Sequence, residues 1–173
     1  MAHILPYKGI LPTIEDSVFV AANAAVIGDV TIGAHSSVWY SVTIRGDVNI
    51  VRIGAGTNIQ DGAVIHVATY GKGTHIGNNV TVGHMALLHD CTIEDEGYVG
   101  MGAVVMDGAV VQSKAFVAAG ALVTPGKVVP TGQLWAGRPA KYLRDLNDDD
   151  YKMMAWSGPH YVRVAAEHKK ATS

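Results

Sequence analysis

The feature that most constrains this chain is a repeat of six residues, in which an aliphatic side chain recurs at every sixth position. The repeat is unbroken from residue 14 to residue 44, and it resumes at Ile53, Ile76 and Ile93 after short interruptions. A period of six matches neither the 3.6-residue period of an α-helix nor the alternation of a simple hairpin sheet. The pattern is typical of a β-solenoid, in which each hexapeptide supplies one short strand and one corner.

Three hexapeptides would form one triangular coil, and the count predicts a stack of about six coils. The composition agrees, because 49% of the residues are hydrophobic but only 7% are aromatic, and a core of similar aliphatic side chains suits stacked repeats. An ordinary sandwich rich in valine and glycine is the alternative, but its strands would not keep one phase along most of the chain. We therefore expect an all-β solenoid.

The end of the chain changes character, so we divide it into a solenoid domain at residues 1–140 and a helical segment at residues 141–173. Asn147 and the three acidic residues after it can cap a helix and favour its dipole. We expect a helix over residues 148–156, an interruption at Gly158-Pro159, and a second helical stretch to about residue 169, all packed against the solenoid.

Charge and composition exclude several partners. The net charge of −2 leaves no basic field for binding nucleic acid. No segment resembles a membrane span or an export signal, and the lone Cys91 cannot form an internal disulfide. We expect a cytoplasmic protein that binds neither nucleic acid nor membranes and takes a neutral or small ligand.

Three histidines fall in phase with the repeat. His66 follows Ile65 and His89 follows Leu88, which places both histidines at the same position of the same face, one coil apart. His84 belongs to a different face of the prism. Two histidines of one chain therefore cannot easily share a metal ion with the third histidine of that chain.

A second copy of the chain could supply the missing histidine. If three prisms pack around a threefold axis, His66 and His89 of one subunit can meet His84 of the next. Three imidazoles with a vacant fourth position form a catalytic zinc site, whereas a structural site is usually closed by four protein ligands. The alternative is structural, with His66 and His89 stacked as a ladder at a corner and His84 bonded to a loop.

The same columns carry further polar residues. Arg45 continues the ladder one coil below the two histidines, with Asp47 two residues later, and Asp61 lies directly under His84. We expect this guanidinium and these carboxylates to form ion pairs between subunits. Gln60 could hydrogen-bond a water bound to the metal or an oxygen of the substrate.

These residues resemble the gamma-class carbonic anhydrases over nearly the whole chain. The motifs that carry the resemblance are Arg45-Gly46-Asp47, Asn58-Ile59-Gln60-Asp61, His66, Gly83-His84, Leu88-His89 and the Gly137-x-Pro139-Ala140-Lys141 ending. The resemblance implies a left-handed parallel β-helix, which is an exception to the usual right-handed crossover. It also implies a homotrimer with zinc, or alternatively iron or cobalt, between subunits.

The resemblance implies that His66, His84 and His89 are the metal ligands and that Gln60 positions the metal-bound hydroxide. It makes Arg45, Asp47 and Asp61 an interfacial ion-pair network and brings Tyr161 of the C-terminal helix toward the site. The reaction would be the reversible hydration of carbon dioxide to bicarbonate. The best-developed members of the family carry an acidic loop as proton shuttle, whereas residues 67–75 contain no carboxylate here, and His75 could substitute for it.

Two other functions remain open on the sequence. An acyltransferase of the hexapeptide superfamily would use one histidine as general base and coenzyme A as donor. A metal- or siderophore-binding scaffold without activity would keep the metal and show no turnover. Fold alone does not separate these functions.

Overall fold

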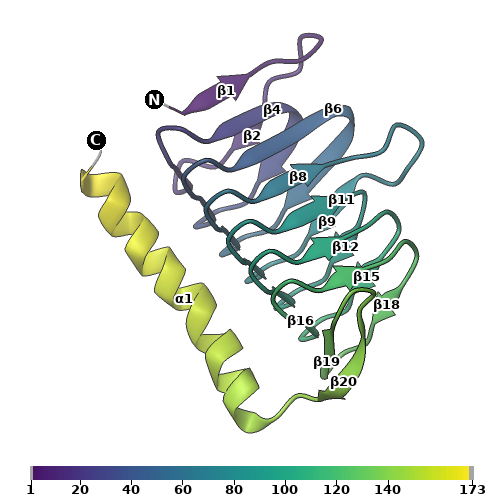
Figure 1. Cartoon of the computed structure of the whole chain (residues 1–173). Helices are drawn as coiled ribbons and strands as arrows, with labels where there is room; N and C mark the ends of the chain where they lie inside the picture. The colour runs from purple at the N-terminus through teal and green to yellow at the C-terminus, as the bar shows by residue number, and fades with distance from the viewer. Residues whose placement is uncertain (1, 172–173) are drawn as a thin grey trace.

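The computed structural model describes residues 2–171, which form a stack of parallel β-strand coils with one long helix along its side (Figure 1). Two faces of the stack belong to a 12-stranded sheet. Its strands are β1 (His3–Leu5), β2 (Thr13–Ile14), β4 (Ala25–Ile32), β6 (Thr43–Ile53), β8 (Val64–His66), β9 (Thr74–Ile76), β11 (Leu87–His89), β12 (Thr92–Ile93), β14 (Val104–Val105), β15 (Val110–Val111), β17 (Leu122–Val123) and β18 (Val128–Val129).

The third face is an eight-stranded sheet. Its strands are β3 (Phe19–Val20), β5 (Ser37–Val38), β7 (Asn58–Ile59), β10 (Thr81–Val82), β13 (Tyr98–Val99), β16 (Phe116–Val117), β19 (Gln133–Ala136) and β20 (Lys141–Asp145). All neighbours in this sheet are parallel except β19 and β20, which pair antiparallel at the end of the stack.

The fold agrees with the predicted left-handed parallel β-helix of hexapeptide repeats with a C-terminal helix. The number of coils differs slightly from the prediction, since the stack has about seven turns, whereas the count predicted about six. The additional turn is closed by β19, where Trp135 occupies the position that aliphatic residues hold elsewhere and pairs in register with Val117. The count predicted fewer turns because it stopped at Val123, before Val129 and Trp135.

The core is built from the repeat itself. Aliphatic residues one coil apart lie in register, as Ile44 does with Ile65 and Leu88 does with both Ile65 and Val105, and all four side chains are completely buried. Small side chains such as Ala63 lie beside them in the interior. Because the buried residues stack in register, the outward-facing residues of successive coils are also aligned, and this determines which polar side chains lie beside each other.

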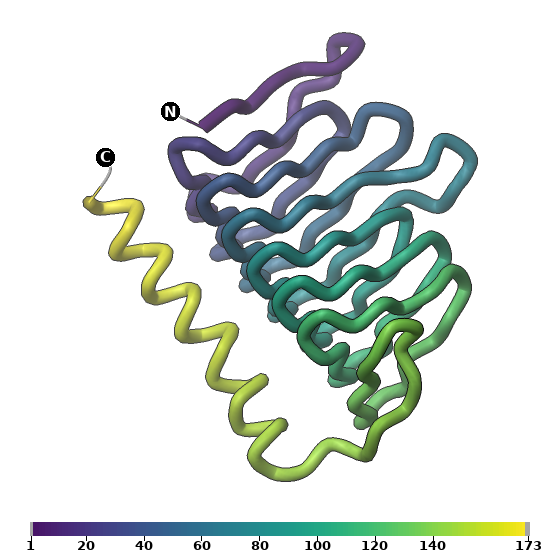
Figure 2. Tube along the Cα trace, viewed as in Figure 1, coloured from purple at the N-terminus to yellow at the C-terminus, as the bar shows by residue number. Residues whose placement is uncertain are grey.

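The helix α1 (Asp148–Ala171) is continuous, so the predicted interruption at Gly158-Pro159 is wrong. It runs back along the coils toward the N-terminal end, as the tube in Figure 2 shows, and it contacts β10, β7, β5 and β3. Gly158 is buried against the coils, and Ser157 bonds to Thr81. These tertiary contacts hold the helix together where Pro159 removes one backbone hydrogen bond.

The start of α1 is capped as the sequence predicts. The backbone N–H of Asp150 donates to the side chain of Asn147 at 3.0 Å, and the Asp150 carboxylate accepts from the backbone N–H of Asn147 at 2.8 Å. Two otherwise unpaired donors at the helix terminus are thus satisfied reciprocally. Within residues 2–171, no helix has the length and apolarity needed to cross a membrane.

Candidate metal centre

His66 and His89 lie side by side on neighbouring coils. They are register partners at the ends of β8 and β11, and their imidazole rings are 5.3 Å apart between centroids. Both side chains are partly exposed, at 22% for His66 and 29% for His89. The structure therefore confirms that the repeat places these two imidazoles together on one outer face.

His84 lies on another face, as the register predicts. It follows β10, and because Val82 pairs with Ile59, His84 is positioned beside Asp61 on the coil before it. The Nδ1 atom of His84 is 2.9 Å from an oxygen of Asp61. No group of three His, Cys, Asp or Glu side chains that could hold a metal ion occurs within residues 2–171. A single chain thus brings two of the three candidate ligands together.

Carboxylates orient two of the three imidazoles. Asp61 engages Nδ1 of His84, and Asp107 engages Nδ1 of His89 at 2.6 Å. A carboxylate on one ring nitrogen fixes the tautomer and leaves the other nitrogen as the ligating atom. Asp107 was missed in the sequence, because the pairing of Leu88 with Val105 places Met106 beside His89 and Asp107 lies one residue further on.

Asp47 makes a different contact with His66. Its carboxylate pairs with the Arg45 guanidinium and lies 3.0 Å from Nε2 of His66. Burial raises the pKa of Asp47, but the hydrogen bonds from His66 and Arg45 outweigh it, so this pKa lies below its ordinary value. Arg45, Asp47 and His66 therefore form one cluster within a single chain.

Gln60 is buried, with 5% of its surface exposed, directly before Asp61. Its Nε2 donates a hydrogen bond to Oδ1 of Asn58 at 3.0 Å. The side chain amide is therefore held by a protein partner on one side. This ordered amide lies on the coil face that also carries Asp61 and His84.

Tyr161 of α1 packs onto the same face. Its ring lies 5.5 Å from that of Trp39, edge to face. Burial raises the pKa of Tyr161, and the nearby Tyr98 and Asp61 raise it further.

Two other residues singled out by the sequence lie elsewhere. His75 belongs to β9 rather than to a loop, on the face shared with β12, and its Nε2 is 3.0 Å from the carbonyl oxygen of Lys72. Cys91 is a free thiol in the core, where burial raises its pKa to about 12. Such a thiol is neither a nucleophile nor a metal ligand near neutral pH.

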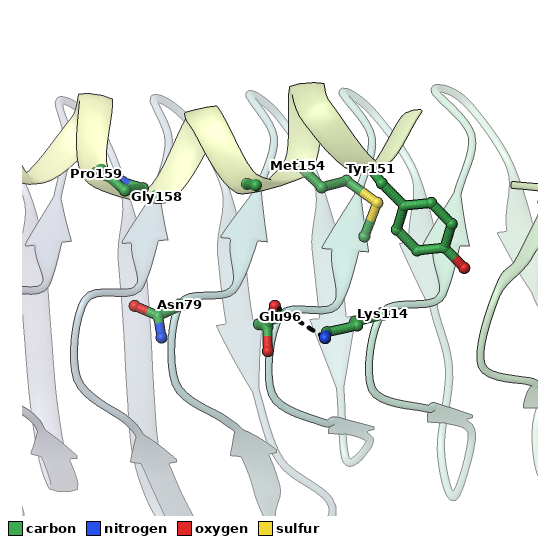
Figure 3. A pocket seen from close by; sticks show the side chains of 8 residues that line it. Asn79, Glu96, Lys114, Tyr151, Met154, Gly158 and Pro159 are labelled. Atoms are coloured by element: carbon green, nitrogen blue, oxygen red, sulfur yellow. Dashed lines mark ion pairs between the residues drawn. The ribbon is translucent and has the colours of Figure 1, made fainter. Parts of the chain in front are cut away.

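A groove of about 650 Å³ runs between α1 and the coils, and Figure 3 shows the side chains that line it. Its polar wall carries Glu96 and Lys114, whose charged atoms are 3.6 Å apart. The groove contains none of the candidate metal ligands or their carboxylate partners. The candidate metal centre at His66, His84 and His89 is therefore separate from this groove.

The chain is similar in sequence to several known proteins. Residues 11–46 match a family model described as bacterial transferase hexapeptide repeats. Gamma carbonic anhydrase 2, a mitochondrial protein of Arabidopsis thaliana, is 48% identical over 167 residues, which cover 94% of this chain and 60% of the plant protein. The chain thus spans about three fifths of the length of such plant relatives. A carbonic anhydrase of Geobacillus kaustophilus is 43% identical over 96% of this chain and 91% of its own length.

Solved structures share the fold over nearly the whole chain. A hexapeptide transferase family protein from Anaplasma phagocytophilum has 44% identity and a TM-score of 0.92, covering 95% of this chain and 97% of its own. A Bacillus cereus protein that is provisionally described as an acetyltransferase has 39% identity and a TM-score of 0.95, covering 98% of both chains.

Proposed function

The chain belongs to the gamma carbonic anhydrase family, and on this premise we propose that it catalyses the reversible hydration of carbon dioxide to bicarbonate at metal sites shared between the subunits of a homotrimer. One observation carries the proposal. His66 and His89 are paired on one face, whereas His84 is oriented by Asp61 on another face. This division suits a site completed by a second copy of the chain.

The residues fit a metal ion of the zinc type. Three imidazoles form a donor set that zinc prefers, and iron or cobalt can use the same set. Asp61 and Asp107 engage Nδ1 of His84 and His89, which leaves Nε2 of each ring to bind the metal. We propose His66, His84 and His89 as the ligands, with His84 contributed by the partner subunit.

A bound zinc ion lowers the pKa of a coordinated water to about 7, and this supplies a nucleophile at neutral pH. The protein contributes orientation. Gln60, held through its amide nitrogen, positions its carbonyl oxygen as an acceptor for the attacking water, while Asp61 and Asp107 keep two imidazoles in the ligating tautomer. Arg45 and Asp47 stabilise the face that carries His66, and Tyr161 would approach the site from α1.

Exposed apolar side chains beside the histidine columns support the trimer. Met85 directly follows His84, Leu87 precedes His89 by two residues, and Val64 precedes His66 by two residues; their exposed fractions are 69%, 37% and 39%. A second copy that covers these side chains would also bring its own histidine columns against them. We propose a cytoplasmic location as well, because the only cysteine is a buried free thiol.

Release of the proton is expected to limit turnover. The segment between β8 and β9 contains no carboxylate, and Nε2 of His75 is already engaged by the backbone carbonyl oxygen of Lys72 within that segment. Small buffer molecules would then take the proton. We expect the hydration rate to rise with the concentration of an imidazole buffer at fixed pH.

The proposal is tested by metal analysis of the untagged protein together with stopped-flow hydration of carbon dioxide. We expect about one metal ion per chain and a rate that His84→Ala abolishes. His75→Ala is the matched control, because His75 lies on the face of β9 and should leave both quantities unchanged. If the protein binds metal but its hydration rate does not exceed that of buffer alone, catalysis is refuted and a metal-binding scaffold is favoured.

Acyl transfer is the second candidate, because the Bacillus cereus neighbour described as an acetyltransferase shares the fold at 39% identity. One of the histidines would then act as general base toward an acceptor hydroxyl or amine. This function predicts release of free thiol from acetyl coenzyme A in the presence of an acceptor, without dependence on metal. Carbonic anhydrase activity predicts no such release.

A further inference from the structure

A series of four buried side chains begins at Gln60 and ends in the C-terminal helix. Gln60 donates to Asn58, Asn58 donates to the Thr81 hydroxyl at 3.0 Å, and Oγ1 of Thr81 is 2.9 Å from Oγ of Ser157 in α1. Asn58, Thr81 and Ser157 are 1%, 2% and 3% exposed. The series runs across the strand pair β7–β10, in which Asn58 and Thr81 are register partners.

The direction of each hydrogen bond follows from one fixed acceptor. The carbonyl oxygen of Val80 can only accept, and it lies 3.3 Å from Nδ2 of Asn58. The amide nitrogen of Asn58 must therefore face Val80 and Thr81, and its Oδ1 must face Gln60. Gln60 in turn must present its amide nitrogen to Asn58. The orientation of one amide thus determines the orientation of the other.

The remaining atom of the Gln60 amide is its carbonyl oxygen, which can only accept. Every fully buried side-chain nitrogen or oxygen within residues 2–171 has a hydrogen-bond partner. Oε1 of Gln60 has no partner among these residues, so it lies where solvent or a ligand reaches it. The series of hydrogen bonds therefore exposes an acceptor at this position rather than a donor.

We propose that Thr81 and Ser157 are positioning residues: through Asn58 they fix the amide of Gln60 so that its carbonyl oxygen faces the reacting water. The assignment of a role in hydration rests on the proposed function, whereas the fixed amide is a property of the free protein. Through Ser157, α1 contributes to the orientation of Gln60, although Ser157 lies 76 residues from Thr81 in sequence. The helix acts through this hydroxyl pair and does not touch the reacting atoms.

The test is the side-chain amide signal of Gln60 in nitrogen–proton correlation spectra of the metal-free protein. The signal is assigned by its loss in Gln60→Glu. In the wild type the two amide protons should be well separated, because one of them is bonded to Asn58. Thr81→Val has a similar shape without the hydroxyl, and it should bring the two shifts together toward those of a free glutamine; Ser157→Ala should do the same in part.

Thr81→Ser keeps the hydroxyl and should preserve the wild-type signal. Thr92→Val, on β12 of another face, removes a similar hydroxyl outside the series and should also preserve it. An unchanged Gln60 signal in both Thr81→Val and Ser157→Ala overturns the proposal. Equal loss in Thr81→Ser and Thr81→Val also overturns it, because the hydroxyl would then not be the cause.

Activity supplies a second, separate measurement. In the metal-loaded protein, Thr81→Val should lower kcat several-fold with little change in KM and in metal content, and Thr81→Ser should restore it. A wild-type protein that does not hydrate carbon dioxide refutes the proposed function, and the amide signal then still decides whether Thr81 and Ser157 fix Gln60. A full kcat in a Thr81→Val variant with a displaced amide signal overturns the positioning role.

Discussion

His66 and His89 occupy equivalent places on successive coils, and their imidazole rings are 5.3 Å apart. The stacking of Ile65 on Leu88 beneath them holds this pair, because both side chains are completely buried and in register. A rigid scaffold under two imidazoles lowers the cost of ordering them around an ion. The arrangement thus links the regular core directly to the proposed metal chemistry.

Removal of either member of this pair should abolish metal binding. We expect His66→Ala and His89→Ala to purify with almost no metal, because two ligands cannot hold zinc in place of three. Elemental analysis after dialysis measures the content, and circular dichroism checks that the solenoid persists. Retention of about one ion per chain in either variant would show that the metal is bound elsewhere.

The carboxylates behind two of the imidazoles should tune affinity without binding the ion. Asp61→Asn and Asp107→Asn should weaken metal binding about 10–100-fold, since each removes the group that orients a histidine. Competition with a chromophoric chelator measures the constant. Asp29→Asn is the control, because Asp29 pairs with Arg52 at 2.7 Å and contacts none of the three histidines. Equal weakening in all three variants would contradict a specific role.

The relative positions of the histidines could be predicted from the sequence because stacking fixes phase: Leu88 on Ile65 determines that His89 lies beside His66. The same register placed Asp61 under His84. The Asp107 contact was not predicted, because a diagonal contact between coils depends on side-chain conformation as well as on register.

The helix α1 shows where prediction from local sequence fails. Local preferences favour a break at Gly158-Pro159, yet contacts with the coils keep α1 continuous. No local pattern relates Ser157 to Thr81, since 76 residues separate them. The polar link from α1 to Gln60 therefore emerges only from the tertiary structure.

Acid should destabilise the helix cap through Asp150. The hydrogen bond from Arg144 holds the pKa of Asp150 below its ordinary value of 3.8 against the opposing effect of burial, and the backbone N–H of Asn147 adds to the lowering. A lowered pKa stabilises the fold above the ordinary carboxyl range, and this stabilisation is lost as the pH falls through the folded-state pKa.

Asp150→Asn should therefore reduce the free energy of unfolding by about 1 kcal/mol at pH 7. The difference from the wild type should shrink as the pH falls below about 4, because the wild-type carboxyl becomes protonated there. Thermal unfolding across this range measures it. Asp149→Asn is the control, since that side chain is 90% exposed. A wild-type advantage that is constant down to the lowest pH would argue against the carboxylate.

Two glycines should respond oppositely to a methyl group. At Gly158 an added Cβ would lie 3.9 Å or more from Asn79 and Gly56, so Gly158→Ala should stabilise α1 by up to about 1 kcal/mol. At Gly54 it would lie 2.6 Å from Asn78 Oδ1 and from the carbonyl carbon of Gly77, so Gly54→Ala should destabilise the coils by about 1–3 kcal/mol. Urea denaturation compares them, and equal destabilisation would contradict the packing under α1.

Each proposed metal site combines His66 and His89 of one subunit with His84 of another. His66→Ala and His84→Ala, carrying different affinity tags, should each be inactive alone. When they are coexpressed and purified through both tags, the mixed trimers contain interfaces at which all three ligands are intact. We predict that these trimers regain both metal and carbon dioxide hydration, in proportion to the intact interfaces. Mixed trimers as inactive and metal-free as their parents would contradict the shared site.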